Sequence, residues 1–250
     1  MNKIYVVGIG PGGCDQMTGI AMNALKNSDT IIGYTVYVDL VKDTFPDKEY
    51  LTTPMKKEVD RCVLAFEEAM KGRIVSMICS GDAGVYGMAG LMYEVGEKYP
   101  EVELEIVPGV TAASAAASVL GAPLMHDFTI ISLSDLMTPY SLIMKRVDCA
   151  GQGDFIVCLY NPKSKKRADY VEKAAEILMK YRDGKTPVGI VRHAGREEES
   201  SYITTLDAVK DAPIDMFSIV IVGNSNTYVR DGKMITPRGY EDKYGFANVE

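Results

Sequence analysis

The sequence contains no long apolar run. No stretch of it approaches the roughly 20 residues that a membrane-spanning helix needs. The N-terminal run at residues 4–9 is too short, and too interrupted by glycine, for a signal peptide. With 250 residues, of which 47% are hydrophobic and 24% are charged, the chain is long enough for one large domain or two small ones. We therefore expect a globular cytoplasmic protein that has no membrane partner.

Cysteine and histidine are scarce, and neither follows a metal-binding pattern. The five cysteines are odd in number and include no C-x-x-C spacing, which is typical of reduced thiols and not of a disulfide framework or a zinc site. Histidine is the side chain that titrates nearest neutral pH, and the sequence has two, His126 and His193. We expect no resident metal, and either histidine is a candidate for proton transfer or for a structural role.

Positive charge is in the minority as well. The net charge is −7 and the pI is about 5.0, so nucleic acid is not an expected partner, because a phosphate backbone requires a basic face. Local basic clusters still offer sites for a carboxylate, or they are solvated helix ends. The clusters are Lys56, Lys57 and Arg61, then Lys145 and Arg146, and then Lys163, Lys165, Lys166 and Arg167.

Three glycine-rich turns carry most of the information about function, because each follows a predicted strand. They are residues 8–13 (GIGPGG), 80–90 (SGDAGVYGMAG) and 108–112 (PGVTA). Turns that leave the strand ends of one α/β sheet can build a crevice for a small molecule. Glycine lets the backbone approach a ligand that a Cβ atom would exclude.

The first turn also matches a dinucleotide-binding fingerprint. Gly8, Gly10 and Gly13 have the spacing G-x-G-x-x-G, so a nucleotide-binding oxidoreductase is an alternative. The acidic residue that would hold the ribose is missing, because the next predicted strand runs into Gly33 and Tyr34. Pro11 also removes a backbone donor from the loop. A tight turn between a strand and a helix is the remaining interpretation.

Strands alternate with helices along the chain, which predicts parallel β-α-β units and an α/β fold. We expect two domains, residues 1–122 and 123–250, with the boundary at residues 121–123. Asp231 and Gly232 are placed for a hairpin turn. Strands are expected at 3–7, 30–32, 73–79, 103–107, 128–133, 155–159, 187–191, 201–205 and 217–222, and helices at 18–26, 55–71, 85–98, 111–119, 141–149 and 168–181.

Taken together, the turns resemble those of the tetrapyrrole methyltransferases, which use S-adenosylmethionine in corrin and sirohaem synthesis. The resemblance covers nearly the whole chain: VGIGPGG, then SGDAGVYG where the family has G-D-x-x-x-[FY]-G, and then VPGVTAASAAAS. It implies a two-domain fold with a mainly parallel sheet in the N-terminal half, a mixed sheet in the C-terminal half and a ligand cleft between them. It also implies a homodimer.

Further segments resemble the branch of the family that methylates carbon 17 of a precorrin-3-type tetrapyrrole and contracts the ring in cobalamin biosynthesis. These segments are residues 33–37 (GYTVY), 126–139 (HDFTIISLSDLMTP) and 159–162 (LYNP). A methyltransferase for another ring position of a corrin or sirohaem precursor is the alternative within the family, and a tetrapyrrole carrier is an alternative outside it. The sequence does not distinguish a cobalt-loaded substrate from a metal-free one.

The resemblance also implies which residues bind S-adenosyl-L-methionine. A carboxylate such as Asp82 can pair with the cofactor's ammonium group, or it caps the following helix. The implied cofactor residues are Pro11, Ser80, Gly81, Asp82, Val85, Thr111, Ala112, Tyr160 and Ala194.

Substrate and catalytic residues are assigned from their chemistry. Larger side chains at the first glycine turn would obstruct the macrocycle. Tyrosine rings can stack on the macrocycle, or the tyrosines begin an amphipathic helix. Basic side chains can bind the carboxylates of the macrocycle. The expected substrate residues are Gly10, Gly12, Gly13, Tyr34, Tyr37, Arg61, Lys145 and Arg192. Ring contraction needs proton transfers, for which we expect His126, Asp127 and Asp135.

Overall fold

The computed structural model describes residues 2–164 and 166–245, so Lys165 of the third basic cluster lies outside the described residues. The chain forms two compact units, and the second begins at Ala113, whereas the sequence places the boundary at 122/123. Residues 113–122 belong with the second unit for two reasons. A Cβ atom built on Gly189 would lie 2.3 Å from Leu120 Cδ1, and Gly121 pairs with Met234.

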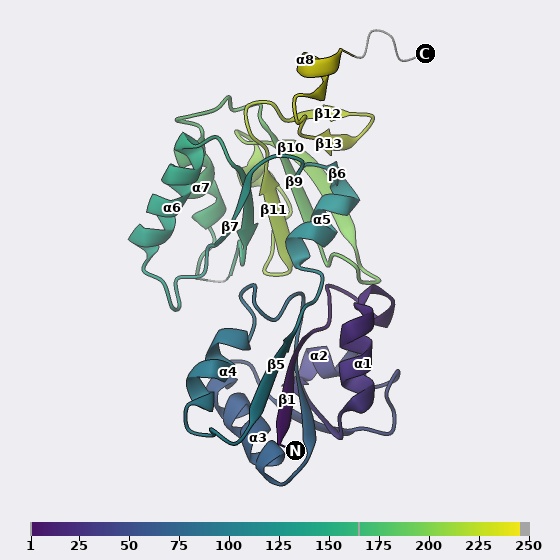
Figure 1. Cartoon of the computed structure of the whole chain (residues 1–250). Helices are drawn as coiled ribbons and strands as arrows, with labels where there is room; N and C mark the ends of the chain where they lie inside the picture. The colour runs from purple at the N-terminus through teal and green to yellow at the C-terminus, as the bar shows by residue number, and fades with distance from the viewer. Residues whose placement is uncertain (1, 165, 246–250) are drawn as a thin grey trace. The chain divides into compact units, whose positions relative to one another are not determined.

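The first unit is a parallel sheet of five strands in the order β3-β2-β4-β1-β5. Figure 1 shows α1 and α2 on one face of the sheet and α3 and α4 on the other. Each face has its own apolar core, because side chains alternate along a strand: Val6 packs with Phe66 of α3, and Val7 packs with Leu25 of α1. The elements are β1 (Lys3–Gly8), α1 (Gly19–Asn27), β2 (Thr30–Tyr34), α2 (Thr35–Asp39), β3 (Glu49–Thr53), α3 (Glu58–Met70), β4 (Ile74–Cys79), α4 (Ala89–Gly96) and β5 (Glu103–Val107).

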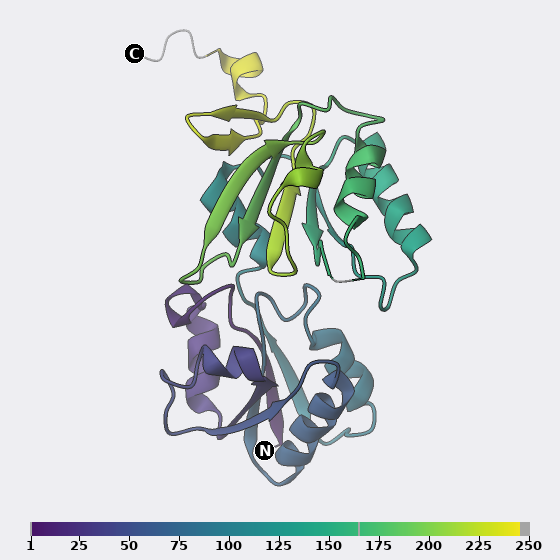
Figure 2. The same cartoon turned by 180° about the vertical axis from the view of Figure 1, so that it is seen from behind.

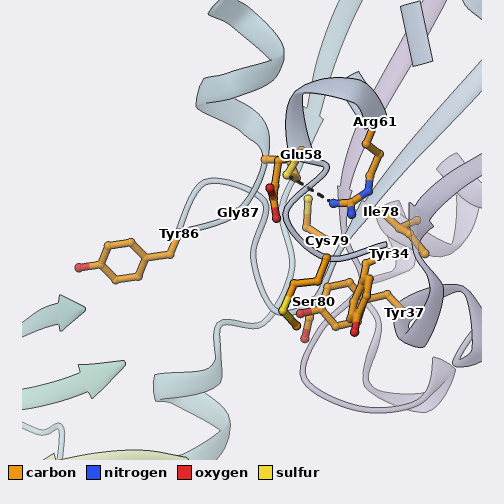
Figure 3. Close-up of a pocket in the computed structure, with 11 residues that line it drawn as sticks. Tyr34, Tyr37, Glu58, Arg61, Ile78, Cys79, Ser80, Tyr86 and Gly87 are labelled. Atoms are coloured by element: carbon orange, nitrogen blue, oxygen red, sulfur yellow. Dashed lines mark hydrogen bonds between the residues drawn. The ribbon is translucent and has the colours of Figure 1, made fainter. Parts of the chain in front are cut away.

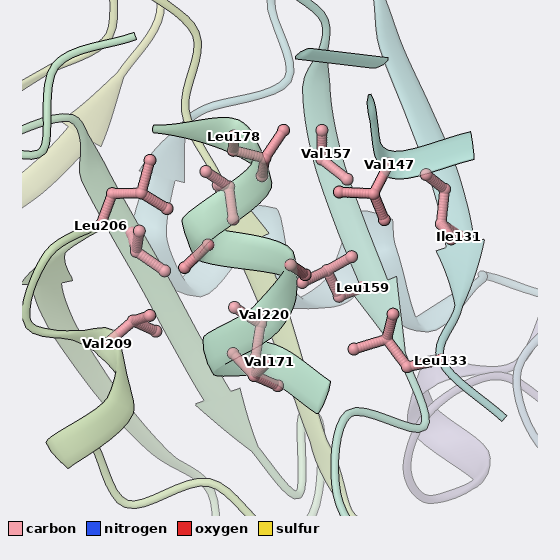
Figure 4. Packing of buried hydrophobic residues seen from close by; sticks show 14 of the residues in the cluster. Ile131, Leu133, Val147, Val157, Leu159, Val171, Leu178, Leu206, Val209 and Val220 are labelled. Carbon is pink, nitrogen blue, oxygen red and sulfur yellow. The ribbon is translucent and has the colours of Figure 1, made fainter. Parts of the chain in front are cut away.

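The second unit contains a mixed sheet in the order β10-β9-β11-β8-β7. Strand β7 is parallel to β8, and β11 is antiparallel to both of its neighbours. Helices α6 and α7 cover one face, where Val147 and Val171 pack against Leu159 and Val220 (Figure 4). Helix α5 covers the other face, because Tyr160, the neighbour of Leu159 in β8, accepts a hydrogen bond from Ala113 N at 2.8 Å. The elements are α5 (Ala112–Leu120), β7 (Phe128–Ser132), α6 (Tyr140–Gln152), β8 (Ile156–Tyr160), α7 (Tyr170–Leu178), β9 (Pro187–Arg192), β10 (Ser200–Thr205) and β11 (Ser218–Val222).

A three-stranded sheet follows, seen from both sides in Figures 1 and 2. It consists of β6 (Gly121–Ala122), β12 (Tyr228–Arg230) and β13 (Lys233–Ile235), and α8 (Tyr240–Tyr244) comes after it. Asp231 and Gly232 have φ values of 50° and 72°, which confirms the predicted hairpin turn with its two left-handed residues. Across residues 2–164 and 166–245, no helix combines the length and the apolar character that crossing a membrane requires.

Three loops meet at the carboxyl edge of the first sheet, and we call their contact the three-loop junction. They follow β1, β4 and β5. Gly10 and Gly81 exchange two backbone hydrogen bonds, of 3.0 and 2.7 Å, and Gly109 N donates to Asp82 Oδ2 at 3.0 Å. A Cβ atom on Gly8 would lie 2.7 Å from both Gly109 N and Gly81 O. Glycine is therefore required at positions 8 and 109 because the chain approaches itself there, and at position 81 because φ is +70°.

Gly109→Ala tests this junction. The new Cβ atom would lie 2.2 Å from Gly81 O and 2.5 Å from Gly8 O, and backbone atoms cannot rotate out of the way. We expect the free energy of unfolding to fall by about 1–3 kcal/mol, measured by chemical denaturation. Gly90→Ala is the matched control, because nothing lies within 4 Å of its Cβ position in α4, and it should stabilise by about 0.5–1 kcal/mol. Equal effects of the two substitutions would contradict the described contact.

Arg182 joins three segments of the second unit. Its side chain is fully buried. The guanidinium donates to Phe155 O at 3.1 Å, to Gly223 O and to Ala150 O at 3.5 Å, and Asp154 lies 3.8 Å away. It therefore ties the end of α6 to the start of β8 and the end of β11.

Arg182→Met should lower the free energy of unfolding by about 3 kcal/mol, because the substitution leaves buried carbonyl groups without a donor. Arg230→Met removes the same charge from a side chain that is 75% exposed and should change stability by less than about 0.5 kcal/mol. Thermal and chemical unfolding of both variants measures the difference, and a loss below about 1 kcal/mol for Arg182→Met would show that water replaces these bonds.

Candidate functional site

The predicted site residues of the first unit gather at the carboxyl edge of its sheet. The loop after β1 carries the glycines and the proline, and the loops after β4 and β5 carry the implied cofactor residues. Their positions are Gly10, Pro11, Gly12 and Gly13 after β1, Tyr34 and Tyr37 at the end of β2 and in α2, Arg61 in α3, Ser80, Gly81, Asp82 and Val85 after β4, and Thr111 and Ala112 after β5.

Asp82 links two of these loops. Its Oδ1 accepts a hydrogen bond from Gly84 N at 2.8 Å, and its Oδ2 accepts one from Gly109 N at 3.0 Å. The predicted alternative, in which Asp82 caps the following helix, is wrong because α4 begins only at Ala89 and its N-cap is Met88. The carboxylate instead fixes the shape of its own turn and holds the loop after β5.

A cavity of about 250 Å³ opens beside the loop after β4 (Figure 3). Its walls come from the ends of β2 and β4, from α2, from the start of α3 and the residue Met55 before it, and from the loop between β4 and α4. In Figure 3 the ring of Tyr86 points away from the other side chains. The lining residues are Tyr34, Tyr37, Met55, Glu58, Arg61, Ile78, Cys79, Ser80, Tyr86, Gly87 and Met88.

Arg61 places a positive charge in the wall of this cavity. The residue is only 5% exposed. Its Nε donates to Thr53 Oγ1 at 2.9 Å and its Nη2 to Pro54 O at 3.2 Å, while Nη1 faces Met88 Sδ at 4.0 Å. All of these partners are neutral. Within residues 2–164 and 166–245, no carboxylate oxygen forms an ion pair with this guanidinium.

Glu58 is the acidic residue among the described residues that line this cavity. Burial raises the pKa of the Cys79 thiol to about 11, so this cysteine is not a thiolate nucleophile. The rings of Tyr34 and Tyr37 meet edge to face with centroids 5.4 Å apart. The cavity therefore combines an aromatic and aliphatic wall with a buried cation.

The second unit has a carboxyl edge of its own, where β7, β8 and β9 end in the same direction. Asp135 follows β7 and accepts hydrogen bonds from Tyr170 at 2.8 Å and from Arg167 at 3.2 Å. The Tyr170 hydroxyl and the Arg167 guanidinium lower the pKa of Asp135. Asp135 is therefore ionised at neutral pH and cannot donate a proton there.

The other predicted site residues of the second unit lie at the ends of β8 and β9 and on α6. Tyr160 ends β8 and holds the backbone of Ala113. Arg192 ends β9, where its Nε lies 2.6 Å from Asp215 Oδ2, and Ala194 is buried just after it. Lys145 is exposed on α6.

His126 and Asp127 do not join Asp135. They precede β7, whereas Asp135 follows it, and a strand of five residues spans about 16 Å. Their side chains are 47% and 83% exposed, and His126 Nδ1 accepts a hydrogen bond from Asp127 N at 2.8 Å. The pair and Asp135 therefore lie at opposite ends of one strand, as the strand predicted at residues 128–133 implies, and the catalytic role of all three stays a prediction.

The structure also argues against the alternative of a nucleotide-binding oxidoreductase. The dinucleotide fold requires the end of the second strand to lie next to the first glycine turn. Here β4 separates β1 from β2, so the two are not adjacent. Gly10 N, which a pyrophosphate would need, donates to Gly81 O. Gly8 and Gly10 of this motif thus serve contact between loops.

Sequence reasoning missed several partners in these sites. Arg167 was expected to open a helix, but α7 begins at Tyr170, and Arg167 pairs with Asp135. Glu58 was missed although its spacing from Arg61 places both on one face of a helix. Nothing in the sequence signals that Met88 and Thr53 contact Arg61, because those contacts depend on the fold.

Comparisons with known proteins agree with this architecture. The model of the family "Tetrapyrrole (Corrin/Porphyrin) Methylases" matches residues 3–210. The probable cobalt-factor III C(17)-methyltransferase of Salmonella typhimurium is 50% identical over 95% of this chain and 99% of its own length. The precorrin-3B C(17)-methyltransferase of a Sinorhizobium species is 38% identical over 95% of this chain and 96% of its own.

A solved structure confirms the predicted fold. The crystal structure of the methyltransferase CobJ superposes with a TM-score of 0.86 at 35% identity, over 94% of this chain and 99% of that one. The sheet of the first unit is parallel and that of the second is mixed, as expected. The family match, the identities and the superposition show that this chain belongs to the tetrapyrrole (corrin/porphyrin) methylases.

Proposed function

We propose that this chain transfers a methyl group from S-adenosyl-L-methionine to carbon 17 of a precorrin-3-type tetrapyrrole and contracts its macrocycle, as a step of cobalamin biosynthesis. The observation that carries the proposal is the 50% identity to a protein named a C(17)-methyltransferase over nearly the whole of both chains. The relative named for cobalt-factor III is more similar than the one named for precorrin-3B, at 50% against 38%. We therefore propose the cobalt-loaded macrocycle as the substrate, with the cobalt as part of that substrate.

The loops of the first unit fit a methyl-donating cofactor. Gly84 is exposed, and a Cβ atom there would meet only the Asp82 carboxylate, at 3.3 Å, so a ligand can approach this backbone closely. S-adenosyl-L-methionine supplies an electrophilic methyl group. In this unit we propose that it contacts Pro11, Ser80, Gly81, Asp82, Val85, Thr111 and Ala112.

Asp82 has a mainly organising role in this proposal. Both of its oxygens accept backbone N–H groups, which keeps the loops after β4 and β5 in one arrangement. Methyl transfer is an in-line displacement, so the chief task of the protein is to hold both reactants in line and to exclude water. A rigid junction of three loops suits that task.

Proton transfer accompanies the contraction of the ring. We propose that Asp135 takes part as an ionised hydrogen-bond acceptor, because Arg167 and Tyr170 hold its carboxylate in place. The exposed pair His126 and Asp127 would have to act separately from it.

Incubation with methyl-labelled S-adenosyl-L-methionine tests the function. We expect the label on carbon 17 of a contracted ring, identified by mass spectrometry and NMR, with faster turnover of the cobalt-loaded precursor than of the metal-free one. Calorimetry should show binding of S-adenosyl-L-homocysteine and no heat with NAD or NADP. A label on another ring carbon would assign the chain to another ring position, and cofactor binding without transfer would argue for a carrier.

Substrate recognition should depend on salt although the whole chain is acidic. Arg192 is 48% exposed, and exposed charges are screened over a Debye length of about 8 Å at physiological ionic strength. We therefore expect the KM for the tetrapyrrole to rise with salt more than the KM for S-adenosyl-L-methionine does. Steady-state kinetics from low to high salt measure both constants, and equal salt dependence would reject electrostatic recognition of the ring.

A further inference from the structure

The cavity beside the loop after β4 is too small for a macrocycle. Pockets that enclose whole drug-sized ligands occupy roughly 300–1,000 Å³, whereas this one occupies about 250 Å³. A single side arm of a larger molecule fits its size. The chemistry of the lining residues determines which kind of side arm can bind.

Two arginines are buried among the described residues, and they differ in their partners. Arg182 has the carboxylate of Asp154 at 3.8 Å. Arg61 has none, and its Nη1 faces a thioether sulfur at 4.0 Å (Figure 3). Because a buried charge is stabilised best by an opposite charge with good hydrogen-bond geometry, Nη1 is the position at which an anion from outside would bind.

The neighbours of Arg61 set the shape and charge of such an anion. Nε and Nη2 donate to Thr53 and Pro54, whereas the contact of Nη1 among the described residues is the Met88 thioether. Tyr34, Tyr37 and Ile78 supply apolar surface for methylene groups. Glu58 also lines the cavity, but its Oε1 accepts the backbone N–H of Lys56 at 3.1 Å.

We propose that this cavity binds one alkyl carboxylate arm, with Arg61 as the residue that recognises its charge. The inference rests on the proposed function, which offers two sources of such an arm. A carboxylate side chain of the tetrapyrrole is one, and the methionine carboxylate of the cofactor is the other. Glu58 opposes the same anion and so limits its affinity.

Calorimetry of four variants tests the proposal with two probes, S-adenosyl-L-homocysteine and the cobalt-loaded tetrapyrrole. Arg61→Gln should weaken the binding of one probe by about 10- to 100-fold, the loss expected for one charge-assisted hydrogen bond. Arg61→Lys keeps the charge without the planar fork and should recover part of that loss. Glu58→Gln should tighten binding of the same probe. Arg230→Gln, a change of charge at an exposed position, is the control and should bind both probes as the unsubstituted protein does.

The probe that weakens identifies the source of the arm. Unchanged binding of both probes to a folded Arg61→Gln protein would overturn the proposal, and so would an equal loss for both, which would indicate distortion of the whole sheet edge. If the Arg61 variants do not fold, Glu58→Gln decides, because unchanged or weaker binding there rejects an anion in the cavity. Product analysis of the unsubstituted enzyme is independent of these titrations, so a wrong ring position would refute the proposed function and leave the carboxylate site standing.

Discussion

The carboxyl edge of the first sheet depends on one contact, in which the backbones of three loops meet directly at their glycines. Gly8, Gly81 and Gly109 approach so closely that any Cβ atom on the first or the last would overlap main-chain atoms. The hydrogen bonds of Gly10 and Asp82 then fix how the loops are aligned. The positions of the proposed cofactor residues follow from this contact, because all the loops that carry them take part in it.

Most strands of both sheets could be predicted from sequence, because they are short apolar runs between turn residues. Buried β4 and β11 are examples. The edge strand β3 was missed, since its residues are half exposed and show no apolar run. Helix α4 begins later than expected because Tyr86 adopts a left-handed φ of 54° and Gly87 lies against the backbone of Ala83. Contacts of that kind override helix propensity.

The candidate site was predictable in its location but not in its interactions. Motif spacing was sufficient to place the loops after β1, β4 and β5 at one edge. It could not show that Asp82 binds Gly109, which lies 27 positions later in the chain, or that Arg61 lacks a carboxylate partner. Nor could it show that Arg167 and Tyr170 donate to Asp135. Each of these facts depends on contacts between residues that are distant in sequence.

The pairing of β6 with β13 determines the order in which the chain can fold during synthesis. All strands of the first sheet lie between Lys3 and Val107, so that unit can close as soon as its own residues have left the ribosome, as N-terminal domains generally do. The second unit starts at Ala113, but Gly121 and Ala122 find their partners only at Met234 and Ile235. Closing so long a loop is slow. The nascent chain therefore carries a folded first unit while β6 is still without β13, the strand with which it pairs.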